Sequence, residues 1–401
     1  MNILRNIKQI FDYKQMGLLE FMFALFPIVS GYTLGPIPVH LWWLLIMDII
    51  AYNRYGLKIK KIPKKYNYLF WFVTIHNFLW TVVIQQHVSI HINLSIGTFI
   101  IMSSFYFICP VIDFEKFKNS LKPLTILSII GMVYCVFMLT RGVIIGQLPL
   151  PPFEQSRNLD ITTDIILLRP NSFFPEPQAF CTYMQIPLFL SLLYKKYIVA
   201  FVIMISMVLS TSTTGLVVPF LMIGIYFFTQ KVSLKWKLFI ISIIACSCLL
   251  ISKTSYFEKT MNKATNTDLS TNERTSVGFM TLPQLNPEEL VLGIPYSNLG
   301  HMYDDGRISG DYMLLGEDSS HTIFLPTFWS VWFQYGIIGL LLYLMIYFEI
   351  YKKSKVLLPF LGTVVVTMFS NSEGVGCTFV YQLCFMYSFI RAQQNNKLAL
   401  K

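Results

Sequence analysis

The stretch Pro123-Leu-Thr-Ile-Leu-Ser-Ile-Ile-Gly-Met-Val-Tyr-Cys-Val-Phe-Met-Leu-Thr140 contains no charged side chain. A bilayer core about 30 Å thick needs roughly 20 apolar residues for each helical crossing. Together with the residues up to 145, this run is long enough to cross a membrane as one helix. Similar runs lie on both sides of it along almost the whole chain, so the sequence predicts an all-α polytopic membrane protein.

The composition excludes an ordinary soluble protein. Of the 401 residues, 54% are hydrophobic and only 13% are charged, which is more apolar surface than a soluble domain can bury. No small-residue cleavage site follows the first apolar run, so we interpret it as a retained helix and not as a signal peptide. We expect about twelve spans in a single integral membrane domain over 1–401. The expected spans are 16–34, 37–54, 67–86, 93–112, 123–145, 177–194, 198–213, 215–230, 237–252, 323–349, 355–371 and 375–391.

Basic residues lie in short clusters between the apolar runs, which accounts for the net charge of +10 without nucleic acid as a partner. Such clusters collect on the cytoplasmic side of membrane proteins. With an even number of spans, every cluster falls on one face and both termini are cytoplasmic. The clusters are Arg54 with Lys58, Lys60, Lys61, Lys64 and Lys65; Lys116, Lys118 and Lys122; Lys195 and Lys196; Lys231, Lys235 and Lys237; and Lys352, Lys353 and Lys355.

Two long polar segments, 146–176 and 253–322, fall on the opposite face and hold most of the acidic residues. Both are rich in turn-forming residues, and we expect short helices within the second. Long non-membrane segments on one face of a helical bundle are usually lids or binding sites. We therefore place the chemistry of the protein in these two outer loops.

The strongest local signal is Arg169-Pro-Asn-Ser-Phe-Phe-Pro-Glu-Pro-Gln-Ala-Phe180, where the first outer loop ends and a span begins. Pro177 suits the first turn of that helix. The free N–H groups at a helix start and the charged fork of Arg169 together favour a phosphate group at the membrane surface. A purely structural role is equally open on these grounds, with Glu176 as a helix cap and Arg169 as an interfacial anchor.

This segment resembles the Arg…Glu-Pro segment of Wzy-type O-antigen and capsule polymerases, in the O-antigen polymerase and ligase superfamily. Leu209-Ser-Thr-Ser-Thr-Thr-Gly215 is similar to their polar turn. Arg274, followed by Leu290-Val-Leu-Gly-Ile-Pro295, is similar to their arginine and Leu-Gly turn. His321 with Gly336-Ile-Ile-Gly339 resembles the histidine that opens the helix after the large outer loop.

Two features depart from that family. Thr213 stands where the polar turn often carries an arginine. Gly336 follows His321 about one helical turn later than in many members and in the related ligases. The four motifs nevertheless keep the family's order over roughly residues 140–345, and the hydropathy pattern extends the likeness to the whole chain.

The resemblance implies a GT-C-like glycosyltransferase on the outer face of the bacterial inner membrane. It implies metal-independent, inverting transfer of a growing glycan from undecaprenyl diphosphate to a lipid-linked repeat unit, which builds O-antigen, capsule or exopolysaccharide. No cofactor is implied. The implied partners are the lipid-linked oligosaccharides, membrane lipid and a chain-length regulator protein.

Arginines are the expected ligands of the lipid diphosphate. This leaving group needs charge neutralisation more than a proton, and arginines and helix N-termini supply it without a metal. We assign diphosphate binding first to Arg169 and Arg274, which the family motifs cover, and then to Arg307 and Arg141. Arg307 and Arg157 also fit solvated turns, and Arg141 also fits a side chain that reaches the surface from the end of its span.

The attacking hydroxyl needs a general base. His321 follows Ser319 and Ser320, either of which suits a helix cap. A histidine in a first helical turn stays neutral, because that end of the helix is positive. We assign the base to His321, with Glu176 as the competing candidate, although an interfacial histidine without a catalytic role fits His321 equally well.

No metal site is expected. His87 and His91 have a spacing that suits metal ligands, but no carboxylate or thiol lies near them in the sequence. Asp304-Asp305 suits a divalent cation in a metal-dependent glycosyltransferase, which is the less favoured alternative. The seven cysteines form no CxxC pair and no Cys/His zinc spacing, so we interpret them as apolar packing residues.

Two other functions remain open. An O-antigen ligase, which transfers finished glycan to the lipid A core, is the alternative enzyme, and the spacing from His321 to Gly336 argues against it. A flippase or transporter of lipid-linked oligosaccharides is the alternative from another class. A flippase needs buried charge in mid-span, whereas the charged residues here lie at span ends and in the outer loops.

Overall fold

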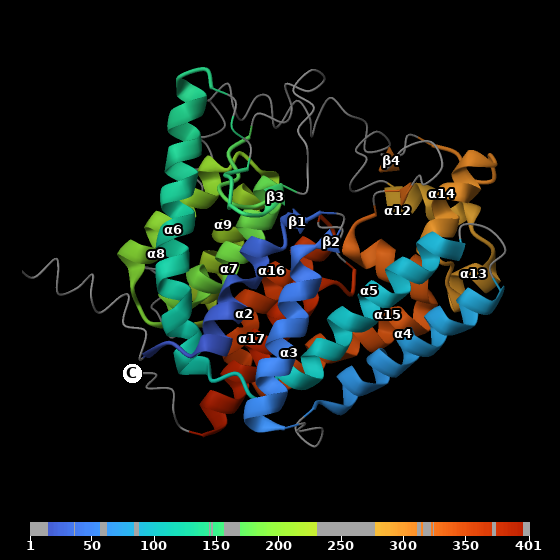
Figure 1. Cartoon of the computed structure of the whole chain (residues 1–401), viewed down its shortest axis with the longest axis horizontal. Coiled ribbons are helices and arrows are strands. Elements are labelled where there is room, and N and C mark those ends of the chain that lie inside the picture. The colour runs from blue at the N-terminus through green and yellow to red at the C-terminus, as the bar shows by residue number, and fades with distance from the viewer. Residues whose placement is uncertain are drawn as a thin grey trace, which may run out of the picture. The chain divides into compact units, whose positions relative to one another are not determined.

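The computed structural model describes most of the chain as two compact units, both mainly helical (Figure 1). Unit 1 is built from Met1–Ile62, Ile100–Ile223 and Cys377–Lys401, and unit 2 from Pro63–Phe99 and Gly224–Gly376. The described residues are 15–35, 37–56, 62–83, 88–143, 145, 147–155, 169–230, 277–310, 314–315, 322–323, 325–370 and 374–395.

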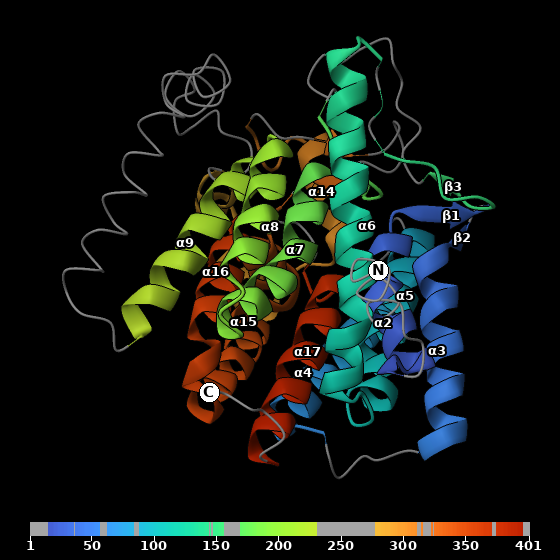
Figure 2. The same cartoon turned by 90° about the vertical axis from the view of Figure 1, so that its left-hand side faces the viewer.

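Unit 1 is a bundle of apolar helices (Figure 2). An aromatic cluster fills its centre, where the ring of Phe23 lies 5.4 Å from that of Phe117 and 5.0 Å from that of Tyr381, centroid to centroid. Aromatic side chains of this kind bury a large apolar area each and favour tilted over face-to-face packing. Its helices are α2 (Leu18–Val29), α3 (Val39–Tyr55), α6 (Phe114–Thr140), α7 (Pro177–Leu193), α8 (Tyr197–Leu209) and α17 (Cys377–Gln394); α5 (Val88–Ile108) and α9 (Thr213–Thr229) contribute to both units.

Unit 2 combines long apolar helices with a group of short elements. The short helices pack on the first half of α15 around a core that includes Leu299, Trp329 and Phe333. The unit contains α4 (Lys64–Val83), α12 (Val277–Thr281), η4 (Leu282–Gln284), α13 (Pro287–Leu292), α14 (Tyr296–Asp304), β4 (Leu314–Leu315), β5 (Thr322–Ile323), α15 (Thr327–Lys353), η5 (Lys355–Leu357) and α16 (Leu358–Met368).

A small antiparallel sheet in unit 1 departs from the predicted all-α fold. Its strands, in the order β2-β1-β3, are β2 (Ile37–Pro38), β1 (Tyr32–Leu34) and β3 (Glu154–Gln155). The span predicted over 16–34 is therefore too long, because α2 ends at Val29. The chain leaves the helix there since the backbone of β1 finds partners in β2 and β3 instead of in a further helical turn.

Both units contain apolar helices that fit insertion into a membrane. Within the described residues, three are long and apolar enough to cross a bilayer: His91–Ile108, Phe114–Thr140 and Thr327–Lys353. Four shorter apolar helices accompany them, at Leu18–Val29, Tyr197–Leu209, Thr213–Thr229 and Lys355–Met368. The structure is mainly helical as expected and is compatible with a membrane protein, while the number of about twelve spans stays a prediction.

The predicted polar interruption between residues 198 and 230 is present. Helix α8 ends at Leu209 and α9 begins at Thr213, with Thr211 between them in the left-handed region (φ 58°). Gly215 lets this turn close tightly, because a Cβ there would lie 2.2 Å from the carbonyl oxygen of Met207. The segment therefore forms two helices and not one.

Basic residues of unit 1 gather at one end of the bundle. There Glu20 Oε1 accepts a hydrogen bond from the Asp113 N–H (3.1 Å), and the Lys118 Nζ lies 4.5 Å from the ring centre of Tyr194. These contacts bring the starts of α2 and α6 to the end of α7. The residues that share this end include Lys116, Lys118, Lys195 and Lys196.

Candidate functional site

The segment from Arg169 to Glu176 is held firmly in unit 1. The Leu148 N–H donates to the Ser172 carbonyl (2.7 Å), and the Ser172 hydroxyl donates to the carbonyl of Ser128 in α6 (2.9 Å). Ser172 is fully buried and adopts a left-handed backbone (φ 57°). A left-handed backbone is unfavourable for serine and persists only where surrounding contacts stabilise it. These hydrogen bonds therefore fix the path of the segment.

Gln147 ties the same segment to the turn after α2. Its Nε2 donates to the carbonyls of Gly31 (3.0 Å) and Phe173 (3.1 Å). The Tyr32 hydroxyl donates to the Leu148 carbonyl at 2.6 Å. Burial raises the pKa of Tyr32 to about 12, against a smaller lowering by Gln147, so the phenol keeps its proton as a donor. The described parts of the predicted outer loop 146–176 thus pack on the helices.

Helix α7 begins directly after this segment. Glu176 occupies the N-cap position with an extended backbone, and Pro177 occupies the first turn, as predicted. The Glu176 side chain makes no capping hydrogen bond, so the cap interpretation of this carboxylate is not what the structure shows. The N–H groups at the start of a helix carry partial positive charge, so this end of α7 is electropositive.

Arg169 and Arg141 both belong to unit 1. Arg169 is half-buried at the start of the anchored segment, seven residues before Glu176 in the sequence. Arg141 is the exposed C-cap of α6, and its guanidinium carbon lies 5.3 Å from the ring centre of Phe137. That contact is a cation–π interaction of the kind expected for a side chain that covers its own helix end.

Arg307 has an acidic partner in unit 2. Its Nη2 lies 2.6 Å from Glu289 Oε1, and Glu289 also accepts a hydrogen bond from the Asn286 N–H at the start of α13 (2.8 Å). The arginine charge is thereby neutralised within the protein, which favours the turn interpretation over diphosphate binding. Beside it, Asp305 Oδ2 pairs with His301 Nε2 at 3.1 Å.

Several predicted residues lie outside the described part of the chain: Arg274, His321, Arg157 and His87. Their roles therefore stay predictions. Within the described residues no group of three His, Cys, Asp or Glu side chains is arranged to hold a metal ion. The candidate site built from described residues is thus the anchored segment with Arg169, Glu176 and the start of α7.

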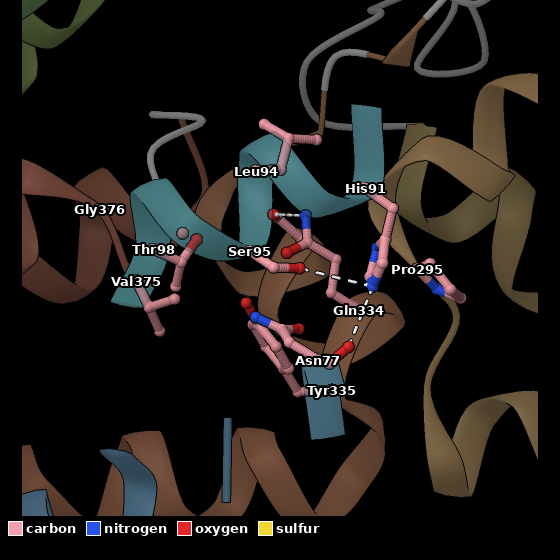
Figure 3. A pocket seen from close by; sticks show the side chains of 12 residues that line it. Asn77, His91, Leu94, Ser95, Thr98, Pro295, Gln334, Tyr335, Val375 and Gly376 are labelled. Carbon is pink, nitrogen blue, oxygen red and sulfur yellow. Dashed lines mark hydrogen bonds between the residues drawn. The ribbon is translucent and has the colours of Figure 1, made fainter. Parts of the chain in front are cut away.

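Unit 2 holds a second feature, a polar cavity of about 220 Å³ among α4, α5 and α15 (Figure 3). Most of its lining side chains carry uncharged hydrogen-bonding groups, although these helices are apolar elsewhere. The lining residues are Asn77, His91, Leu94, Ser95, Thr98, Pro295, Ser330, Gln334, Tyr335, Gly374, Val375 and Gly376.

A hydrogen-bonded triad joins α4 to α5 at this cavity. The buried His91 Nε2 lies 3.1 Å from the Asn77 carbonyl oxygen and 3.4 Å from Ser95 Oγ, as the dashed lines in Figure 3 show. Because a carbonyl can only accept, Nε2 must carry the hydrogen. Ser95 Oγ, which also lines the cavity, is then a second acceptor near that N–H.

A break in α15 shapes the opposite wall. Gly336 has φ 63° and ψ −176°, so the helix stops and restarts there, unlike the continuous span predicted over 323–349. The turn after α13 enters the break, where the Ile294 N–H donates to the Phe333 carbonyl at 2.6 Å. Gln334 and Tyr335, the last residues before the break, face the cavity, and Gln334 Nε2 donates to Ser330 Oγ at 2.9 Å.

The spacing of polar residues in the sequence indicates one face of this cavity. His91, Ser95 and Thr98 are spaced i, i+4 and i+7, and Ser330 and Gln334 are spaced i, i+4. Such spacings put polar side chains on one face of an apolar helix. The structure gives His91 a role in this hydrogen-bonded face, whereas the His87–His91 spacing taken alone suits metal ligands. The pairing of the two polar faces is a tertiary feature that periodicity alone does not reveal.

No protein-family model, no curated protein and no solved structure matches this chain. The likeness to a family therefore rests on the four sequence motifs.

Proposed function

We propose that this protein is a Wzy-type polymerase that joins lipid-diphosphate-linked oligosaccharides on the outer face of a bacterial inner membrane. In this proposal about twelve spans form a GT-C-like scaffold with cytoplasmic termini. The reaction is inverting glycosyl transfer: an acceptor hydroxyl attacks the anomeric carbon of the donor glycan, and the lipid diphosphate leaves.

The observation that carries the proposal is the anchored segment before α7. It holds a half-buried Arg169 in the same short segment that leads into the start of α7. The two groups are the kinds that stabilise a departing diphosphate without proton transfer. Both groups belong to unit 1, close in the sequence to Ser172, which bonds to Ser128 of α6. They lie at or before the start of α7, whereas Lys195 and Lys196 follow its end.

The roles of the remaining residues follow from the motifs. Arg274 supplies a second positive charge for the diphosphate, and His321 accepts the proton of the acceptor hydroxyl, with Glu176 as the alternative base. Arg307 already has Glu289 as its partner, so it contributes less to the diphosphate site than Arg169 and Arg274.

Reconstitution with a synthetic undecaprenyl-diphosphate repeat unit tests the proposal. Purified protein in liposomes should lengthen the glycan in the presence of EDTA and without nucleotide sugars. Arg169→Ala should slow elongation about 10²- to 10³-fold, the loss expected when a group that stabilises transition-state charge is removed. Arg54→Ala, which removes an exposed arginine at the end of α3, is the matched control and should elongate at the wild-type rate.

Three results would contradict the polymerase. The first is elongation that EDTA abolishes, and the second is an Arg169→Ala variant as active as Arg54→Ala. The third is passage of the lipid-linked substrate across the vesicle bilayer without any lengthening, which would favour the flippase. Transfer to a lipid A core in place of a second repeat unit would identify the ligase.

A further inference from the structure

We propose that the polar cavity of unit 2 binds one uncharged, hydroxyl-rich sugar ring. The identity of this ring as part of the lipid-linked repeat unit rests on the proposed function, whereas the binding of the ring to the cavity does not. The lining side chains that carry the inference are Ser95, Ser330 and Gln334.

The position of the cavity requires a polar occupant. Its walls come from α5 and α15, each of which contains a segment apolar enough to cross a bilayer. Hydrogen-bonding groups facing an empty space among such helices cost free energy unless something satisfies them. An apolar lipid tail would leave those groups unsatisfied, so water or a hydrogen-bonding ligand has to occupy the cavity.

The lining offers both donors and acceptors at fixed positions. Ser95 Oγ lines the cavity beside the bond from His91 Nε2 to the Asn77 backbone carbonyl, and a serine hydroxyl can both donate and accept. On the opposite wall, Ser330 Oγ accepts from Gln334, so its own hydrogen is free to donate, and the Gln334 amide retains a second N–H and its oxygen. Alternating donors and acceptors match sugar hydroxyls, each of which both donates and accepts.

The charge of the lining selects against ions. Among the lining residues that the structure describes, none is Asp, Glu, Lys or Arg. A phosphate or a uronate would lose its hydration without gaining an opposite charge, which is strongly unfavourable at low polarity. The cavity therefore differs in chemistry from the arginine-containing segment of unit 1, and it suits the uncharged part of a substrate.

The size of the cavity fits a single ring. Sites for drug-sized ligands measure roughly 300–1,000 Å³, and the cavity of about 220 Å³ lies below that range. The glycine at 374 contributes to this space, because a Cβ there would come 3.4 Å from Ser330 Oγ. One pyranose ring can enter, and the rest of an oligosaccharide has to lie outside.

Isothermal titration calorimetry on the purified full-length protein in nanodiscs tests the inference. The ligands are the methyl glycosides of glucose, galactose, mannose and N-acetylglucosamine, with methyl glucuronide and inorganic diphosphate as charged comparisons. At least one neutral glycoside should bind with one-to-one saturation, and the charged ligands should bind at least about tenfold more weakly.

Variants locate the site. Ser95→Ala and Gln334→Met each remove hydrogen-bonding groups of the lining, and each should weaken sugar binding on the order of 2- to 10-fold. The matched controls are Ser103→Ala, on α5 outside the lining, and Gln382→Met, a buried glutamine in α17. Both controls should bind like the wild type, and unfolding temperatures of all four variants confirm that they are folded.

Specific outcomes overturn the inference. They are the absence of binding by every neutral glycoside, equally tight binding of the glucuronide, and lining variants that bind like their controls. Elongation activity is measured on the same samples and separates the two proposals. Sugar binding without elongation would support the sugar site and contradict the proposed polymerase activity. Elongation without sugar binding would support the polymerase activity and contradict the sugar site.

Discussion

At the scale of single residues, Gly336 determines whether α15 can break where it does. Its φ of 63° is a left-handed conformation, and an added Cβ would lie 2.0 Å from the Val291 carbonyl oxygen. We expect Gly336→Ala to destabilise the protein by about 2–4 kcal/mol, because strain and a backbone clash act together. A fluorescence-monitored thermal melt in detergent should show a clear decrease in the unfolding temperature.

The matched control for this variant is Gly97→Ala. Gly97 lies in the regular helix α5, and a Cβ there would meet nothing within 4 Å. Alanine is the better helix former, so this change should leave the unfolding temperature equal or slightly higher. If Gly336→Ala and Gly97→Ala unfold at the same temperature, α15 does not have a strained break at Gly336.

Arg307 provides a second test at the residue scale. The ion pair with Glu289 is largely exposed, and exposed pairs contribute about 0–1 kcal/mol to stability. We expect Arg307→Ala to elongate glycans within about twofold of the wild type, since an arginine that is already neutralised has little charge to offer a diphosphate. A loss as large as that of Arg169→Ala would show that Arg307 leaves Glu289 to bind substrate.

At the scale of elements, the start of α7 depends on the bonds that Gln147 makes. Gln147→Leu would remove the hydrogen-bond donor to the carbonyls of Gly31 and Phe173, which lie in the interior of the segment's packing. Unpaired buried groups cost about 1–3 kcal/mol each, so local opening of the segment should become more frequent. Hydrogen exchange followed by mass spectrometry should show faster exchange over 147–155 and 169–176.

A comparable glutamine in unit 2 serves as the control. Gln284 Nε2 also bridges two carbonyls, those of Met280 (2.8 Å) and Ser309 (3.0 Å). Gln284→Leu should speed exchange near these residues and leave 169–176 unchanged. Unchanged exchange of 169–176 in Gln147→Leu would mean that other contacts hold the segment.

The sequence predicted most helices of this protein and fewer of their ends. Long apolar runs such as 123–145 fix a helix because lipid leaves the backbone no other partner. The end of α2 at Val29 and the break at Gly336 depend on β3 and on α13, which are distant in the sequence. Tertiary partners of this kind leave no periodic signal.

In the candidate site, too, features that depend on local residues were predictable, and features that depend on distant partners were not. Pro177 predicted the start of α7 because its ring suits a first helical turn whatever surrounds it. The polar cavity depends on two helix faces meeting, so the polar spacing on α5 indicated a face without indicating its partner. The sequence likewise gave no indication that Glu289 would neutralise Arg307.

At the scale of the whole molecule, the sorting of charge in unit 1 predicts how it lies in the membrane. Lys195 and Lys196 follow the end of α7, and Arg169 and Glu176 precede its start. The helix is about 25 Å long, close to the thickness of a bilayer core. Basic residues are retained on the cytoplasmic side, so the anchored segment should face outward.

Cysteine labelling measures this orientation directly. In a chain whose own cysteines are replaced, Glu154→Cys and Lys196→Cys put one exposed thiol near each end of unit 1. A membrane-impermeant maleimide should label residue 154 in spheroplasts, and residue 196 only after the membrane is opened, because a charged reagent cannot cross the lipid. The reverse pattern would place Arg169 in the cytoplasm, where a polymerase of exported glycans has no substrate. Labelling of both thiols in spheroplasts would mean that α7 does not separate the two sides of the membrane, and the proposed reaction would then lose its location.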